Sequence, residues 1–106
     1  MYVAEYNNHR IQVFTPEGQY LRMLSKGAGP GELCRPAGVA IDGDQVYVAE
    51  GGNHRLSVFS TEGKFLKSFG VKGKAKAQFQ YPHSVHVNKD GFIFVADCDN
   101  RRIQVL

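Results

Sequence analysis

Short stretches rich in Val, Ile, Phe and Tyr, each bounded by Gly, Pro, Asn or Asp, recur along the whole chain. Such stretches are typical of β-strands, and no segment keeps a sustained helical period. The pattern therefore predicts an all-β protein. The expected strands are residues 2–4, 10–14, 19–24, 38–41, 46–49, 55–59, 64–69, 84–87, 93–96 and 102–106.

The strands fall into two burial patterns. One group is almost continuously apolar, namely 2–4, 46–49 and 93–96. In the other group apolar and polar residues alternate, namely 10–14, 19–24, 55–59, 64–69 and 102–106. A continuous apolar run predicts a strand covered on both faces, whereas alternation predicts a half-buried outer strand.

The strand pattern repeats. Residues 2–14 (YVAEYNNHRIQVF), 47–59 (YVAEGGNHRLSVF) and 94–106 (FVADCDNRRIQVL) align without gaps at offsets of 45 and 47 residues. Two further segments also match, 15–24 with 60–69 and 35–42 with 81–88. Four-stranded antiparallel units of about 40–50 residues, joined by one longer link, are the pattern of β-propeller blades.

The period divides the chain. Residues 1–25 are expected to form a partial blade, 36–70 a complete blade and 82–106 a second partial blade, with links at 26–35 and 71–81. Gly18 and Gly63 lie in short turns, where we expect a positive φ. We expect about two and a half blades of a larger propeller, and hence a fragment whose partners include the remaining blades of its own ring.

The turn Asn8-His9-Arg10 followed by Ile11, and Asn53-His54-Arg55 followed by Leu56, resemble the signature of the NHL repeat. The third unit departs from it, because Arg101 stands where the others have His. The resemblance implies a propeller of about six blades used as a binding platform. The chain is most similar to the C-terminal propellers of tripartite-motif proteins, which implies a role in binding RNA or protein, as the recruiting part of a ubiquitin ligase.

Charged residues recur within this motif. Glu5, Glu50 and Asp97 are each followed five residues later by Arg10, Arg55 and Arg102. We expect each acid to pair with its arginine across a hairpin, and Asn8, Asn53 and Asn100 to take the left-handed turn conformation. A ligand site is the alternative reading of Asn-His-Arg. A catalytic set would occur once, so recurrence in every unit favours a structural motif.

The links carry the candidate binding residues. Lys72, Lys74 and Lys76 precede Phe79 and Tyr81, and such a mixture of cations and rings suits phosphates and bases. The candidates for RNA or partner binding are Lys26, Arg35, Lys72, Lys74, Lys76, Tyr6 and Tyr81. The alternative is a solvated loop in which Phe79 plugs the space between blades, since it aligns with Leu33.

Metal and catalytic chemistry have weaker signals. His83 and His86 lie three residues apart in an expected strand, which points them to opposite faces. Cys34 and Cys98 are lone thiols without metal-ligand spacing. No nucleophile motif or phosphate loop is present in the sequence, so we expect no enzyme activity, no cofactor and no small-molecule substrate.

Composition adds limited constraints. A hydrophobic content of 42% argues against disorder, and a net charge of +3 permits an anionic partner. The longest apolar run, 92–96, is far shorter than the roughly 20 residues that cross a bilayer. No signal-peptide pattern is visible, so we expect a cytoplasmic protein without membrane contact.

We therefore expect a non-enzymatic module that recognises protein or single-stranded RNA. The alternatives are a piece of a metal-dependent, lyase-type propeller and a purely structural or sensor propeller.

Overall fold

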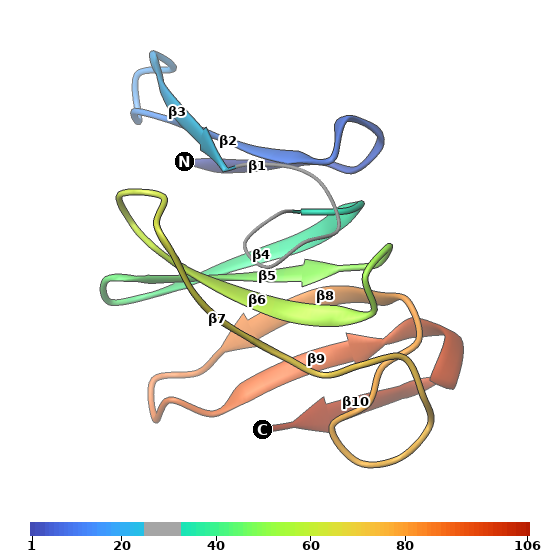
Figure 1. Ribbon diagram of the computed structural model, residues 1–106. Coiled ribbons are helices and arrows are strands. Elements are labelled where there is room, and N and C mark those ends of the chain that lie inside the picture. Colours follow the sequence, from blue (N-terminus) through green and yellow to red (C-terminus); the bar gives the residue numbers. More distant parts are fainter. Residues whose placement is uncertain (25–32) are drawn as a thin grey trace.

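The chain folds into three antiparallel β-sheets that stack one on another (Figure 1). The computed structural model describes residues 1–24 and 33–106. The first sheet consists of β1 (Tyr2–Glu5), β2 (Arg10–Phe14) and β3 (Tyr20–Leu24). The second consists of β4 (Pro36–Asp42), β5 (Gln45–Glu50), β6 (Arg55–Ser60) and β7 (Phe65–Phe69). The third consists of β8 (Pro82–Val87), β9 (Ile93–Asp97) and β10 (Arg102–Val105).

Two 3-10 turns, η1 (Tyr6–Asn8) and η2 (Cys98–Asn100), are the helical segments found within residues 1–24 and 33–106. The prediction of an all-β fold made of blade-like antiparallel sheets is confirmed.

The three sheets share one register. In each, the same repeat positions face each other across the hairpin, namely Tyr2 with Val13, Tyr47 with Val58 and Phe94 with Val105. Gly18 and Gly63 have φ values of 92° and 96°, so the expected left-handed turns are present. Because the register is the same in all three sheets, the hairpin turn that follows each acid lies at the same end of each sheet.

Two hydrophobic layers lie on opposite faces of the middle sheet. The layer toward the first sheet is built from Ile11, Leu24, Leu33, Val46, Val48 and Phe59. The layer toward the third sheet is built from Tyr47, Ala49, Leu56, Val58, Phe79, Val85 and Val95. Alternate residues of β5 therefore enter opposite layers, as the strand's continuous apolar run predicted.

Leu33 and Phe79 come from the links and are both completely buried. Each closes the layer between two consecutive sheets. Phe79 is therefore a packing residue, as its alignment with Leu33 suggested, and it is not available to stack on a ligand.

The burial of β6 differs from expectation. Its alternating pattern predicted a half-buried strand, but Leu56 through Phe59 are all buried. Ser57 is tolerated inside because its hydroxyl donates a hydrogen bond to Glu50. The alternation survives in β2 and β10, which belong to the outer sheets.

Each outer sheet leaves one face open to solvent. Val3 is 40% exposed, Ile103 63% and Val105 56%. The matching positions of the middle sheet, Val48, Leu56 and Val58, are fully buried. The outer sheets thus present to solvent the positions that another sheet covers in the middle of the stack.

Strands β4 and β8 pack directly on each other, and Gly38 lies at their closest approach. A Cβ atom at position 38 would lie 2.8 Å from the Ser84 Cα atom and 2.9 Å from the His83 carbonyl oxygen. Both contacts are with backbone, so a larger residue fits only if one strand moves.

We predict that Gly38→Ala lowers the free energy of unfolding by about 1–3 kcal/mol, the usual cost of overpacking. Urea unfolding followed by far-UV circular dichroism measures the change. Ser68→Ala, at an exposed position of β7 in the same sheet, is the control and is expected to change stability by less than about 0.5 kcal/mol. Equal stability of Gly38→Ala and wild type would refute the close packing of β4 on β8.

Candidate binding surface

An acidic residue ends β1, β5 and β9, and each pairs with an arginine that faces it across the hairpin. The nitrogen–oxygen distances are 3.0 Å for Arg10–Glu5, 2.8 Å for Arg55–Glu50 and 3.0 Å for Arg102–Asp97. The three expected ion pairs are therefore present. Glu50 and Asp97 are fully buried, so their charge depends on these partners.

The same carboxylates accept further hydrogen bonds. The asparagine of each turn donates its side-chain amide, at 2.6 Å from Asn8 to Glu5, 2.8 Å from Asn53 to Glu50 and 2.8 Å from Asn100 to Asp97. Hydrogen bonds to a carboxylate favour its charged form. The Arg10 guanidinium and, next, the Asn8 amide lower the pKa of Glu5 to about 2.

A polar side chain of the next strand completes each cluster. Gln12 donates to Glu5, Ser57 to Glu50 and Gln104 to Asp97. These three residues are not among the motif residues predicted from the sequence. Their signal was available, because the same strand position is polar in every unit, between two apolar neighbours.

Glu50 and Asp97 also accept a hydrogen bond from the backbone of the link that precedes their sheet. Glu50 accepts the backbone N–H of Cys34 at 3.1 Å, and Asp97 accepts that of Gln80 at 2.7 Å. Cys34 and Gln80 occupy the same repeat position, two residues before a new first strand. The acid therefore fixes where each link enters its sheet.

The left-handed residue of each turn is not the asparagine that the sequence analysis expected. It is the next residue, with φ values of 55° for His9, 52° for His54 and 55° for Arg101. The asparagine instead ends the 3-10 turn or its equivalent, where its side chain reaches back to the acid. His and Asn both tolerate this conformation, so propensity alone could not separate them.

The two histidines clamp consecutive sheets together. His9 Nδ1 accepts the backbone N–H of Arg35 at 3.0 Å, and His54 Nδ1 accepts that of Tyr81 at 2.9 Å. Each bond joins a turn of one sheet to the residue just before the first strand of the next sheet. The histidine must be neutral at Nδ1 to accept it.

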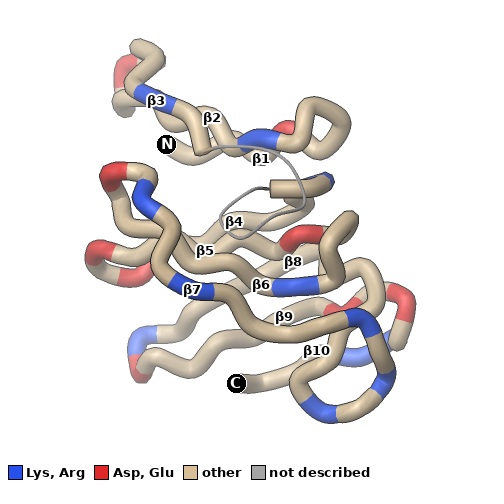
Figure 2. The backbone as a smooth tube through the Cα atoms, viewed as in Figure 1, with Lys and Arg blue, Asp and Glu red and all other residues tan. Residues whose placement is uncertain are grey.

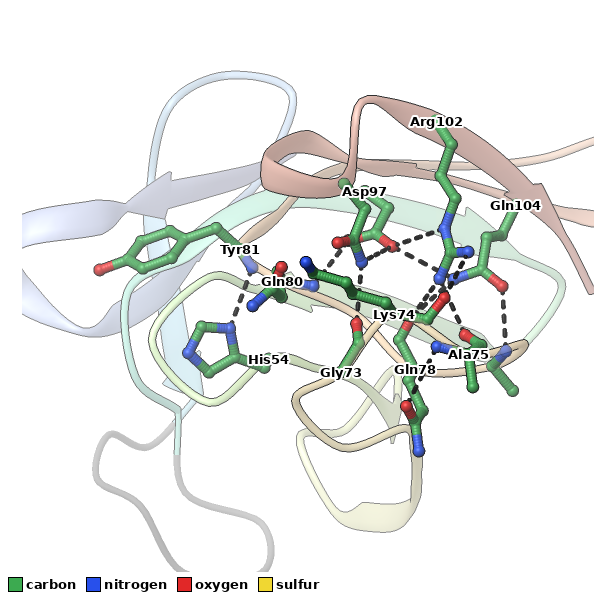
Figure 3. Close-up of polar contacts among 12 residues, drawn as sticks. His54, Gly73, Lys74, Ala75, Gln78, Gln80, Tyr81, Asp97, Arg102 and Gln104 are labelled. Carbon is green, nitrogen blue, oxygen red and sulfur yellow. Dashed lines mark hydrogen bonds and ion pairs between the residues drawn. The ribbon is translucent and has the colours of Figure 1, made fainter.

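The second link is fixed by side chains of the third sheet (Figure 3). Arg102 donates to the carbonyl oxygens of Lys74 at 2.8 Å, Ala75 at 2.8 Å and Gln78 at 3.0 Å. Asn100 donates to the Gly73 carbonyl at 2.8 Å. The backbone of this link is thus held in place, while the side chains of Lys72, Lys74 and Lys76 are exposed.

Three candidate residues from distant parts of the sequence come together. Arg35 donates to the Tyr81 hydroxyl at 2.7 Å, and its guanidinium lies 5.9 Å from the Tyr6 ring centroid. Both tyrosines border a pocket of about 290 Å³ between the first residues of β4 and β8. Pro36 and Pro82, which start these strands, form part of its wall. A cation beside two rings suits a flat ligand that carries negative charge.

We call the end of the stack that holds these groups the link face, defined by Tyr6, Arg35, Lys72, Lys74, Lys76, Tyr81 and Arg101. His54 lies between the tyrosines and the lysines of the link face. Its ring centroid is 5.3 Å from that of Tyr81, and the Lys72 ammonium contributes to lowering the pKa of His54. Lys26, the remaining candidate, lies outside the described residues.

The acids of the short turns lie at one end of the stack, where Lys64 and Lys89 accompany them, and most other cations lie toward the opposite end (Figure 2). Among the described residues, the link face carries one acidic residue besides the three acids of the ion pairs, namely Asp99. The opposite end carries the acids of the short turns, namely Glu17, Asp42, Asp44, Glu62 and Asp90. The link face therefore attracts anions, although the net charge of the chain is small.

The other chemical candidates lie apart from each other. His83 borders the pocket beside Tyr81, whereas the His86 ring lies 6.3 Å from that of Phe94. Cys34 and Cys98 are free thiols. Residues 1–24 and 33–106 contain no group of three or more His, Cys, Asp or Glu side chains placed to hold a metal ion. The same residues include no helix with the length and apolarity to cross a membrane.

The His54 clamp predicts a pH-dependent stability. Burial and, secondarily, the Lys72 ammonium lower the pKa of His54, while Asp99 and Asp97 oppose the shift. The unfolded chain therefore takes up the proton first, and the free energy of unfolding should fall as the pH drops below about 6.5.

Urea unfolding between pH 8 and pH 5.5 tests this, with His54→Asn expected to flatten the dependence. The exposed His83, changed to Asn, is the matched control and should leave the dependence intact. An unaltered pH dependence in His54→Asn would show that the clamp does not titrate in this range.

A family model of the NHL repeat matches residues 33–59 and 79–106, which together make more than half of the chain. Among solved structures, the chain resembles a Kuenenia stuttgartiensis hydrazine synthase at 14% sequence identity with a TM-score of 0.67. The match covers 98% of this chain and 31% of that one, so this chain spans about a third of its length. At this identity the likeness shows the fold alone. No curated protein matches the sequence.

The family match includes the Glu50 and Asp97 clusters and the buried link residues Leu33 and Phe79, whereas the Glu5 cluster lies outside the matched ranges. The recurring geometry and the match agree: the chain belongs to the NHL repeat family, as its motifs indicated.

Proposed function

We propose that this chain is a non-enzymatic binding module that takes single-stranded RNA on its link face. NHL repeats of this kind form propeller-type binding or scaffold modules, which supports the general role. The recruiting role in a ubiquitin ligase, implied by the resemblance to tripartite-motif proteins, stays a prediction.

The non-enzymatic role is supported by what the motif residues do. Glu5, Glu50 and Asp97 each bind an arginine and an asparagine of their own turn. Because the same arrangement occurs in all three sheets, these carboxylates act as folding elements.

The choice of RNA rests on one observation: the Arg35 guanidinium bonds the Tyr81 hydroxyl and lies 5.9 Å from the Tyr6 ring centroid, on the end of the molecule that also carries the exposed lysines. Rings that stack on bases, beside cations that contact phosphates, are the usual elements of a single-strand binding surface. The hydrogen bonds from Arg102 that fix the backbone of the second link also support the proposal. Lysines on an ordered segment lose less conformational entropy when they bind a ligand.

We predict that changing Lys72, Lys74 and Lys76 together to Ala weakens binding of a fluorescein-labelled oligouridine. If each lysine meets one phosphate, the slope of log K against log salt should fall in magnitude by about 2. Fluorescence anisotropy between 50 and 200 mM salt measures both values.

The matched control changes Lys64, Lys67 and Lys89 to Ala, which removes the same charge away from the link face. The control is expected to keep the wild-type slope. If both triple variants lose affinity equally, binding follows net charge alone and the link face has no special role. If wild type does not bind, the RNA proposal fails and protein recognition becomes the leading function.

A further inference from the structure

Arg101 occupies the position of the clamping histidines but has the opposite hydrogen-bonding chemistry. It follows a 3-10 turn and has φ of 55°, as His9 has. His9 and His54 use this position to accept a backbone N–H from the next sheet. A guanidinium has five N–H donors and no acceptor, so Arg101 cannot form that bond. Whatever binds at this corner must instead supply oxygen acceptors.

The surroundings of Arg101 form a shallow pocket of about 270 Å³. Its wall consists of Lys74, Asp99, Asn100, Arg101 and Arg102. Two of these residues are already engaged, since Asn100 binds Asp97 and Gly73 while Arg102 binds Asp97 and three carbonyl oxygens of the link. Their hydrogen bonds fix the backbone of the second link against η2 and β10, and so fix the wall of the pocket.

Lys74 and Arg101 are exposed, and no ion pair joins either side chain to another part of the chain that the structure describes. Asp99 is the acidic group on the pocket wall. Two uncommitted cations against one carboxylate leave an excess positive charge. A group with several oxygen acceptors can meet the guanidinium with two hydrogen bonds and the ammonium with a third.

The geometry points to a phosphate-binding corner formed by Arg101 and Lys74, which holds one backbone phosphate of the single-stranded RNA on the link face. This inference rests on the proposed function. It gives a binding role to Arg101, a residue that the sequence pattern places in the structural motif. A phosphodiester suits the corner better than an isolated carboxylate, because Lys72 and Lys76 flank Lys74 at alternate positions and extend the positive charge along the link.

Arg101→His is the natural test, because His takes the same left-handed turn in the other two sheets and should preserve the fold. At pH 8 this histidine is neutral. We expect weaker binding of the labelled oligouridine and a salt slope smaller in magnitude by about 0.7, the value for one lost phosphate contact. Arg101→Lys should keep the slope while losing part of the affinity, because an ammonium lacks the paired donors of a guanidinium.

A second measurement separates this inference from the proposed function. Inorganic pyrophosphate is titrated into wild type and Arg101→His, and the backbone amide signals of Lys74, Asn100 and Arg101 are followed by NMR. Selective shifts in wild type that are lost in the variant support the corner, even if the oligouridine fails to bind and the RNA proposal falls.

Other outcomes overturn it. If RNA binds equally to wild type and Arg101→His, the proposed function stands and the corner is wrong. If pyrophosphate leaves these signals unchanged and RNA binding does not depend on Arg101, no phosphate is held there. If a glutamate-rich peptide binds through Arg101 while RNA and pyrophosphate do not, the corner recognises carboxylates and the phosphate assignment is wrong.

Discussion

The carboxylate that ends β1, β5 and β9, fully buried at Glu50 and Asp97 and partly exposed at Glu5, is the group on which the other features depend. An isolated charge inside a protein is costly, so Glu50 and Asp97 must be surrounded by donors. They recruit an arginine, an asparagine, a strand side chain and a link N–H. One carboxylate thereby fixes the turn, the facing strand and the entry of the link. Loss of the arginine would leave a buried charge unpaired, and loss of a neutral donor would leave a carboxylate oxygen short of a hydrogen bond.

The position of the links follows from these anchors and from the hydrophobic layers. Leu33 and Phe79 are inserted between sheets, and the acids hold the backbone one residue further on. In the second link, the apolar Phe79 side chain is buried and the backbone is fixed, while the side chains of Lys72, Lys74 and Lys76 remain exposed. These cations therefore lie at the end of the stack opposite the acids of the short turns (Figure 2).

The repeat itself gives the strongest argument about function, because positions can be compared within one chain. Where all three units agree, as at Glu5, Glu50 and Asp97, the residue serves the fold. Where one unit departs, as at Arg101, the turn conformation is kept while the chemistry of the side chain changes. A departure that also reverses donor and acceptor chemistry changes what can bind there.

The sequence by itself determined the fold class, the ten strands and their hairpin pairing, because each repeat encodes local alternation and turn chemistry. It also indicated the acid–arginine pairs, since both residues lie within one hairpin. Only the structure decided that the left-handed residue is the one after the asparagine, His9, His54 or Arg101, because asparagine and histidine both tolerate that conformation. It also decided that Tyr6, Arg35 and Tyr81 meet, since that contact depends on how three sheets stack and no local pattern encodes it.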